Sequence, residues 1–126
     1  MSSVIERKKV KEMFSNIAST YDFLNHSLSF GLDFYWRKRA VSFLCENSIS
    51  SPIFLDIATG TGDVILEIFK QSKSKKNKSK TRVFGLDFAF PMLGIGKSKI
   101  AKQLLDCNFI QGDALSLPFK NGSFDG

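Results

Sequence analysis

Residues 53–63 have the sequence IFLDIATGTGD, in which a short apolar run leads directly into a glycine turn. The run Ile53–Ile57 contains one carboxylate and follows a proline, a pattern that predicts a buried strand of a parallel sheet. Gly60 and Gly62 let the backbone turn tightly and approach a ligand, because glycine has no side chain. The apolar residues that follow recur at helical spacing, so residues 53–69 predict a strand, a turn and a helix.

The same alternation continues toward the carboxyl terminus. Residues 82–87 and 108–111 predict two further strands, and residues 91–105, which open with a proline, predict the helix between them. Strands that alternate with helices predict parallel pairing with right-handed crossovers. The tract KSKKNKSK at residues 73–80 predicts a solvated loop rather than a nucleic-acid surface, because it interleaves no aromatic side chain for bases to stack on.

Two amphipathic helices are predicted ahead of the first strand. Residues 4–17 place apolar side chains at three- and four-residue spacings, and residues 33–45 do so with a stripe of Trp36, Ala40, Phe43 and Leu44. We therefore expect a single α/β domain over residues 1–126, with a helical cap segment at residues 1–50 and a half-sheet at residues 51–126 that carries the ligand site. Three parallel strands with flanking helices make about half of a doubly wound sheet, so the sequence predicts a domain that is truncated at its carboxyl end.

Composition narrows the class of protein. The 126 residues are 43% hydrophobic and 24% charged, which is typical of a soluble globular domain. No apolar run is long enough to predict a transmembrane helix. Cys45 and Cys107 are too few and too far apart to predict a metal site or a disulfide framework, which favours the reducing cytoplasm, and His26 is the sole histidine. The net charge of +6 leaves anionic lipid open as a partner.

Carboxylates frame the glycine turn on both sides. Asp56 lies before it and Asp63 after it, and Ile65 occupies the position where a dinucleotide site would have its third glycine. An acidic side chain at the first position of a helix repels a pyrophosphate bound at that helix N-terminus. The two acids instead favour a ligand with positive charge, such as an amino acid joined to a nucleoside through a sulfonium.

The ends of the next two strands also carry acids. Asp87 ends the second strand, where a carboxylate can accept hydrogen bonds from both ribose hydroxyls, and Phe88 follows it and could lie against a purine. Asp113 follows the third strand and could accept from an exocyclic adenine amine. Each acid alone is equally typical of a helix start, a turn or a cap. Their occurrence at successive strand ends favours a nucleoside site.

Further motifs accompany the turn. Together with LDIATGTGD at residues 55–63, they resemble the amino-terminal half of the menaquinone/ubiquinone biosynthesis C-methyltransferases, a family of class I S-adenosylmethionine-dependent methyltransferases. The resemblance spans essentially the whole chain, and its amino-terminal motifs separate this family from other methyltransferases. The motifs are FSNIASTYD at residues 14–22, Asn25, LSFG at 28–31, Trp36-Arg37, GLDF at 85–88, Met92-Leu93, QGDA at 111–114, LPF at 117–119 and SFD at 123–125.

The resemblance implies a Rossmann-like fold, S-adenosylmethionine as cofactor, and methyl transfer to a ring carbon of a prenylated quinol. No catalytic base is assigned, because a lone histidine such as His26 is more often structural than catalytic. The implied cofactor-binding positions, which add to Asp56 before the turn, are Thr61, Asp87, Asp113 and Ala114, with Gly60 and Gly62 as points of close backbone approach and Tyr21 as a nearby aromatic.

Two alternatives stay open at this stage. The chain could be a non-catalytic S-adenosylmethionine-binding fragment or a split subunit that needs a partner, because the family continues well beyond Gly126. An end at Gly126 would leave the strand at residues 53–57 as an unpaired edge, which predicts poor folding as a monomer and association into oligomers. The helix at residues 4–17 could either pack on the sheet or bring a cytoplasmic protein into peripheral contact with the membrane that holds its lipophilic substrate.

Overall fold

The computed structural model describes residues 2–17, 20, 27–29, 31–47, 50–74, 80–103 and 105–126. A parallel sheet has the strand order β1-β2-β3, formed by β1 (Ile53–Ile57), β2 (Arg82–Asp87) and β3 (Cys107–Gln111). The predicted α/β class and all three predicted strands are confirmed, with β3 beginning one residue earlier than expected. The apolar runs account for this, because a strand covered by helices needs apolar side chains along its length.

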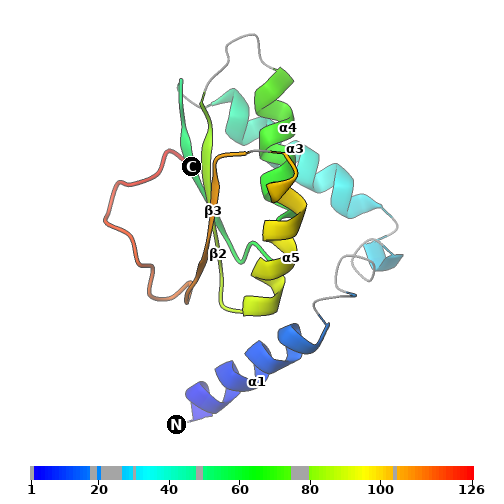
Figure 1. Cartoon of the computed structure of the whole chain (residues 1–126), viewed down its shortest axis with the longest axis vertical. Coiled ribbons are helices and arrows are strands. Elements are labelled where there is room, and N and C mark those ends of the chain that lie inside the picture. The colour runs from blue at the N-terminus through cyan, green and yellow to red at the C-terminus, as the bar shows by residue number, and fades with distance from the viewer. Residues whose placement is uncertain are drawn as a thin grey trace.

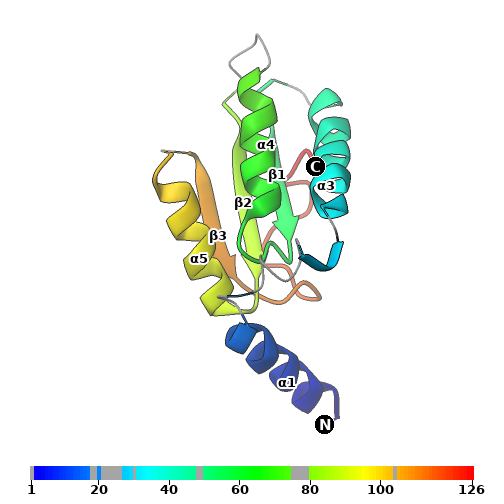
Figure 2. The same cartoon turned by 90° about the vertical axis from the view of Figure 1, so that its right-hand side faces the viewer.

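The helical layer lies on one face of the sheet (Figures 1 and 2). It comprises α3 (Leu32–Glu46), α4 (Asp63–Ser74) and α5 (Phe90–Ala101), so α5 ends before the predicted limit at Leu105. The core between this layer and the sheet contains the buried side chains of Val41, Cys45, Phe54, Ile65, Ile68, Phe69, Val83 and Ile100.

The buried face of α3 differs from the predicted one. Trp36 and Phe43, which were expected in its buried stripe, are 65% and 72% exposed, whereas Val41 and Cys45 are buried. The helix therefore turns an adjoining face toward α4 and the sheet, and Leu44 is the member of the predicted stripe that packs against the core. Gln71 of α4 fixes this orientation in part, because its amide nitrogen donates to the backbone carbonyl of Lys38 at 3.0 Å.

The opposite face of the sheet is crossed by residues 112–126 (Figure 1). Phe119 and Phe124 of this segment pack edge to face on Phe84 of β2, with ring centroids 5.9 and 5.8 Å from it. Successive side chains of a strand point to opposite faces, so Phe84 points away from the core that contains its neighbour Val83.

β1 is an edge strand of the sheet, as expected, but the beginning of its outer edge is paired rather than open. The Asp125 amide donates to the Ile53 carbonyl at 2.8 Å, and the Leu55 amide donates to the Gly126 carbonyl at 3.0 Å. The Ile53 amide also donates to the Asp125 carboxylate at 2.8 Å. Asp125 and Gly126 thus run along β1 as a neighbouring strand would.

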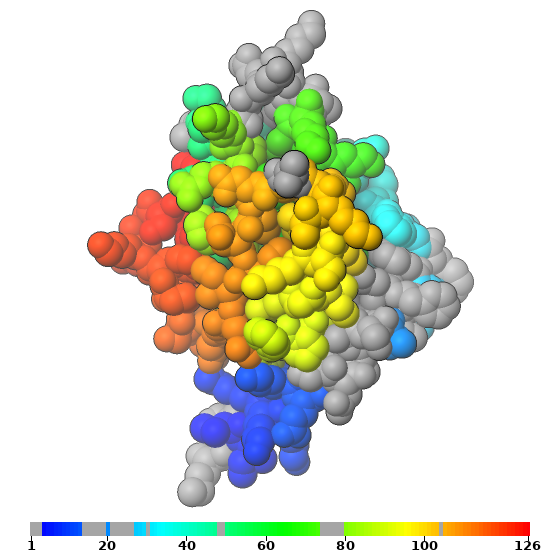
Figure 3. Space-filling view, in the orientation of Figure 1, coloured from blue at the N-terminus to red at the C-terminus, as the bar shows by residue number. Residues whose placement is uncertain are grey.

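Helix α1 (Ser2–Ile17) lies beyond the carboxyl ends of the strands and contacts α5 of the helical layer (Figures 2 and 3). The predicted helix is confirmed, but the apolar side chains of it that the structure describes, Val4, Ile5, Val10 and Met13, are exposed. The loop predicted at residues 73–80 begins later than expected, because Lys73 and Ser74 belong to α4. Residues 75–79 lie outside the described residues, as do Tyr21 and His26. Within the described part of the chain, no helix is long and apolar enough to span a membrane.

Candidate functional site

The turn after β1 is tied to the end of β2. Gly60 and Gly62 have φ angles of 57° and 85°, a region that glycine enters without steric cost. The Thr59 amide donates to the Leu86 carbonyl at 3.0 Å, and the Gly60 amide donates to Asp87 Oδ2 at 2.8 Å. The backbone amides of the turn are consequently bonded to β2 and to the Asp87 side chain, which fixes the position of the turn relative to Asp87.

Asp87 is a buried carboxylate at the end of β2. Its Oδ2 accepts from Gly60, and its Oδ1 accepts from the Ala89 amide at 2.9 Å. A carboxylate oxygen has two lone pairs, so each oxygen retains one after these bonds. Asp87 also lines the cavity at the strand ends, where the remaining lone pairs could accept ribose hydroxyls.

Asp113 is held in the turn that follows β3. Its Oδ1 accepts from the Leu115 amide at 2.9 Å, and its Oδ2 accepts from Arg7 Nη1 of α1 at 2.8 Å. The backbone of Asp113 also forms an isolated antiparallel bridge with Ser116. These bonds orient the carboxylate. No pattern in the sequence indicates that a residue of α1 takes part.

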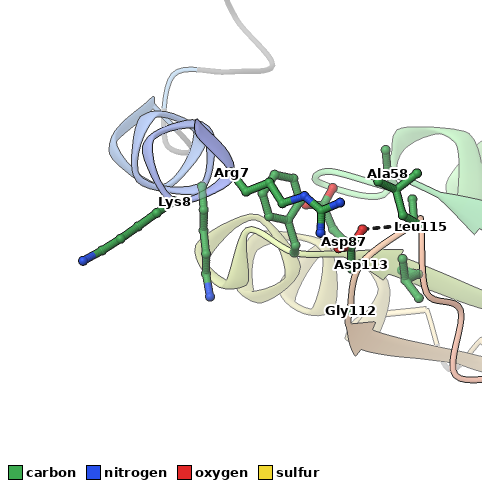
Figure 4. A pocket seen from close by; sticks show the side chains of 11 residues that line it. Arg7, Lys8, Ala58, Asp87, Gly112, Asp113 and Leu115 are labelled. Carbon is green, nitrogen blue, oxygen red and sulfur yellow. Dashed lines mark hydrogen bonds and ion pairs between the residues drawn. The ribbon is translucent and has the colours of Figure 1, made fainter. Parts of the chain in front are cut away.

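A cavity of about 390 Å³ lies between α1 and the strand ends (Figure 4). This volume is within the range of small-molecule sites. Figure 4 shows Arg7 reaching from α1 toward Asp113, with Ala58 and Asp87 on the sheet side. The full lining comprises Arg7, Lys8, Lys11, Ala58, Leu86, Asp87, Phe88, Gly112, Asp113, Ala114 and Leu115.

The cavity fits the adenosine part of S-adenosylmethionine. Leu86, Phe88 and Leu115 give it apolar walls suited to a purine, while Asp87 and Asp113 supply acceptors for hydroxyls and an exocyclic amine. Ala58 lines the cavity with a φ of 58°. Such a conformation is uncommon for a residue with a side chain and is found at functional sites more often than elsewhere.

Asp56 contributes negative charge near the same turn. Burial raises the pKa of Asp56, a hydrogen bond from the Thr59 hydroxyl at 2.7 Å lowers it, and the Asp87 carboxylate raises it further. The ionised form of a half-buried acid beside a second acid gains from a nearby positive charge. This arrangement favours a cationic ligand next to the turn.

Asp63 was also expected to favour a cationic ligand, but its carboxylate is paired with cations of the chain itself. Lys99 Nζ lies 3.0 Å from Asp63 Oδ1 and donates to the Thr61 hydroxyl at 3.0 Å, so α5 is fastened to the turn. Arg37 of α3 lies 3.7 Å from Asp63 Oδ2 and donates to Asp33 at 3.0 Å. Two cations of the chain therefore balance the charge of Asp63, and its carboxylate joins three helices.

The structure divides the predicted site residues into two groups. Asp87, Asp113 and Ala114 meet at the cavity, as do Phe88 and Gly112. Gly60, Thr61 and Gly62 are buried in the turn, and Asp56 lies before it, all outside the cavity lining. Tyr21 lies outside the described residues. Among the described residues, no group of His, Cys, Asp and Glu is placed to hold a metal ion.

Parallel strands with helices, and a nucleoside-sized cavity at their carboxyl ends, are typical of doubly wound α/β folds, and solved class I S-adenosylmethionine-dependent methyltransferases share this fold. A methyltransferase described as S-adenosyl-L-methionine-dependent, from Methanococcus maripaludis, has a TM-score of 0.60 and 21% identity over 87% of this chain and 45% of its own. Haemonchus contortus phosphoethanolamine N-methyltransferase 1 has a TM-score of 0.66 and 17% identity over 99% of this chain and 25% of its own.

Sequence comparison identifies the family. Residues 2–126 match the model of the ubiE/COQ5 methyltransferase family, and the chain belongs to that family. Demethylmenaquinone methyltransferase of Thermus thermophilus is 45% identical over 113 residues, which cover 90% of this chain and 48% of that protein. The ubiquinone/menaquinone biosynthesis C-methyltransferase of Geotalea uraniireducens is 39% identical over 127 residues, with 94% and 48% covered. The predicted family is thereby confirmed, and the chain spans about half the length of these relatives.

Proposed function

We propose that this chain binds S-adenosylmethionine at the strand ends and that the protein methylates a ring carbon of a prenylated quinol in menaquinone or ubiquinone biosynthesis. The observation that supports the proposal most directly is the meeting of Asp87 and Asp113, from separate strand ends, at one largely apolar cavity. The names of the relatives support methyl transfer over the alternative of a non-catalytic binding fragment.

The residues of the chain would act by binding and orientation. When bound, S-adenosylmethionine supplies an electrophilic methyl group on a sulfonium sulfur. Asp87 would hold the ribose and Asp113 the adenine amine, while Asp56 would place negative charge close to the turn. Lys99 and Arg37 keep the turn in place through Asp63. Held geometry of this kind accelerates a transfer reaction without a chemical step by the protein itself.

Titration calorimetry with S-adenosylhomocysteine, the demethylated product, tests the cofactor site. Asp87→Asn should weaken binding by about 1–3 kcal/mol, because it removes a charge-assisted acceptor from buried hydroxyls. Asp106→Asn is the matched control, since Asp106 is an exposed acid ahead of β3 and does not line the cavity. Equal affinity of wild type and Asp87→Asn would refute the assignment. Methyl transfer to a demethylated prenyl quinol would then test the reaction.

We also infer that the protein works at the surface of a membrane, where a prenylated quinol resides. Val4, Ile5, Val10 and Met13 of α1 are exposed, and α1 also carries Lys8, Lys9 and Lys11. Exposed apolar side chains beside lysines favour an anionic bilayer. Replacing the three lysines by Gln should weaken sedimentation with phosphatidylglycerol vesicles by about fivefold for each charge removed. Unchanged sedimentation would contradict this placement.

A further inference from the structure

The ion pair between Arg7 and Asp113 links α1 to the turn after β3 at the cavity. Arg7 Nη1 lies 2.8 Å from Asp113 Oδ2, and the residues are 106 positions apart in the sequence. Figure 4 shows the Arg7 side chain extended from α1 to the turn after β3. Both side chains line the cavity, and about half of each remains exposed, at 54% and 43%.

The apolar side chains of α1 that the structure describes contribute little to holding it in this place. Its side chains Val4, Ile5, Val10 and Met13 are exposed rather than packed against the strand ends. The cavity wall on this side consists of the charged residues Arg7, Lys8 and Lys11. Besides its contact with α5, α1 is joined to the turn after β3 by this ion pair. An exposed ion pair is a weaker link than an apolar contact of the same extent would be.

The closed ion pair leaves room for a ligand beneath it. The cavity of about 390 Å³ exists with Arg7 and Asp113 in contact. Asp113 accepts one donor on each oxygen, from Leu115 and from Arg7, and each oxygen retains a lone pair. An adenine amine could consequently bond to Asp113 while Arg7 stays in place. The planar guanidinium is also suited to lie against a flat aromatic ring.

We propose that Arg7 is a positioning residue that fastens α1 as a lid over the adenosine end of the cofactor. This inference rests on the proposed function, because it takes the cavity as the S-adenosylmethionine site. The lid encloses the nucleoside and slows its release. It also keeps the Asp113 carboxylate directed toward the adenine, between Arg7 on one side and the Leu115 amide on the other.

The test compares wild type, Arg7→Gln and Lys9→Gln by two measurements with S-adenosylhomocysteine. Lys9→Gln removes the same charge from the same helix, but Lys9 does not line the cavity. Calorimetry should show about three- to tenfold weaker binding for Arg7→Gln, the range for losing an exposed ion pair and a stacked guanidinium together. In about 0.5 M salt the gap should shrink, because exposed ion pairs are screened.

Hydrogen exchange of the α1 amides provides the second measurement and does not depend on turnover. The ligand should slow exchange across α1 in wild type and Lys9→Gln, and should fail to do so in Arg7→Gln. Equal affinity and equal protection in Arg7→Gln would overturn the proposal, and so would tighter binding, which would mean that the ion pair opposes the ligand. Failure of wild type to bind S-adenosylhomocysteine at all would instead refute the cofactor site itself.

Discussion

Gly96→Ala is expected to push α5 away from the glycine turn, because Gly96 is where that helix comes closest to it. A Cβ atom built at Gly96 would lie 2.9 Å from Cε1 and 3.0 Å from Cζ of Phe109, and 3.2 Å from the carbonyl oxygen of Thr61. Phe109 cannot retreat freely, since its ring also lies beneath Gly62 and Gly85. The added methyl group must therefore displace the helix or the turn.

Gly94→Ala provides a control in the same helix. A Cβ atom at Gly94 meets nothing within 4 Å, so this change should stabilise the fold by about 0.5–1 kcal/mol through helix propensity. Gly96→Ala gains the same propensity but incurs overpacking of about 1–3 kcal/mol. We expect the two variants to differ by about 1–3 kcal/mol in the free energy of unfolding.

Urea unfolding of the two variants measures this difference directly. Thermal unfolding should agree, with a shift in Tm of about 4 °C for each kcal/mol at this chain length. A Gly96→Ala protein as stable as Gly94→Ala would show that α5 and the turn are not in close contact, and the reasoning would be wrong. Where Gly96→Ala does fold, a displaced Thr61 carbonyl should also lower the affinity for S-adenosylhomocysteine.

Three further predictions concern acids and a thiol. The pKa of Asp56 is higher in the folded chain than in the unfolded chain, so this carboxyl destabilises the fold as pH rises from 3.8 through the raised pKa. Asp56→Asn should therefore be more stable than wild type near pH 7 but not near pH 3.5. Urea midpoints that are equal for the two proteins at both pH values would contradict this. Burial, with Asp106 and Asp56 nearby, raises the pKa of Cys107 to about 12, so iodoacetamide should alkylate it about a hundredfold or more slowly than a free cysteine near pH 8, as mass spectrometry can check. Asp125→Ala should cost about 1–2 kcal/mol of unfolding free energy by removing the acceptor of the Ile53 amide, and a denaturation midpoint equal to that of wild type would show that the bond contributes nothing.

The strands could be predicted from the sequence because their pattern is local. Ile53–Ile57 and Arg82–Asp87 are short apolar runs between turn residues, and both appear with the expected bounds. The order of acids along the chain likewise predicted which side chains meet, since parallel strands place their carboxyl ends at one edge. Asp87 and Asp113 do line a common cavity.

The orientation of α3 and the part played by α1 could not be predicted in the same way. The apolar residues of α3 predicted a buried face with Trp36 and Phe43, yet Val41 and Cys45 are the residues that are buried. A hydrophobic pattern identifies a helix but not which of two apolar faces its neighbours cover. The contact of Arg7 with Asp113 joins residues whose sequence positions carry no common pattern, so only the path of the chain brings them together.

The pairing of β1 with Asp125 and Gly126 has a consequence for the order of events on the ribosome. Ile53 and Asp125 are separated by 72 positions, and at 5–20 residues per second about 4 to 14 seconds pass between their syntheses. β2 can pair with one edge of β1 soon after it is synthesised. The other edge stays unpaired until Asp125 and Gly126 are synthesised. During that interval the nascent chain displays an apolar strand edge, the kind of surface that invites wrong pairing. We expect chaperones that bind extended apolar segments to engage residues 53–57 in translation, and to release them once Asp125 and Gly126 emerge.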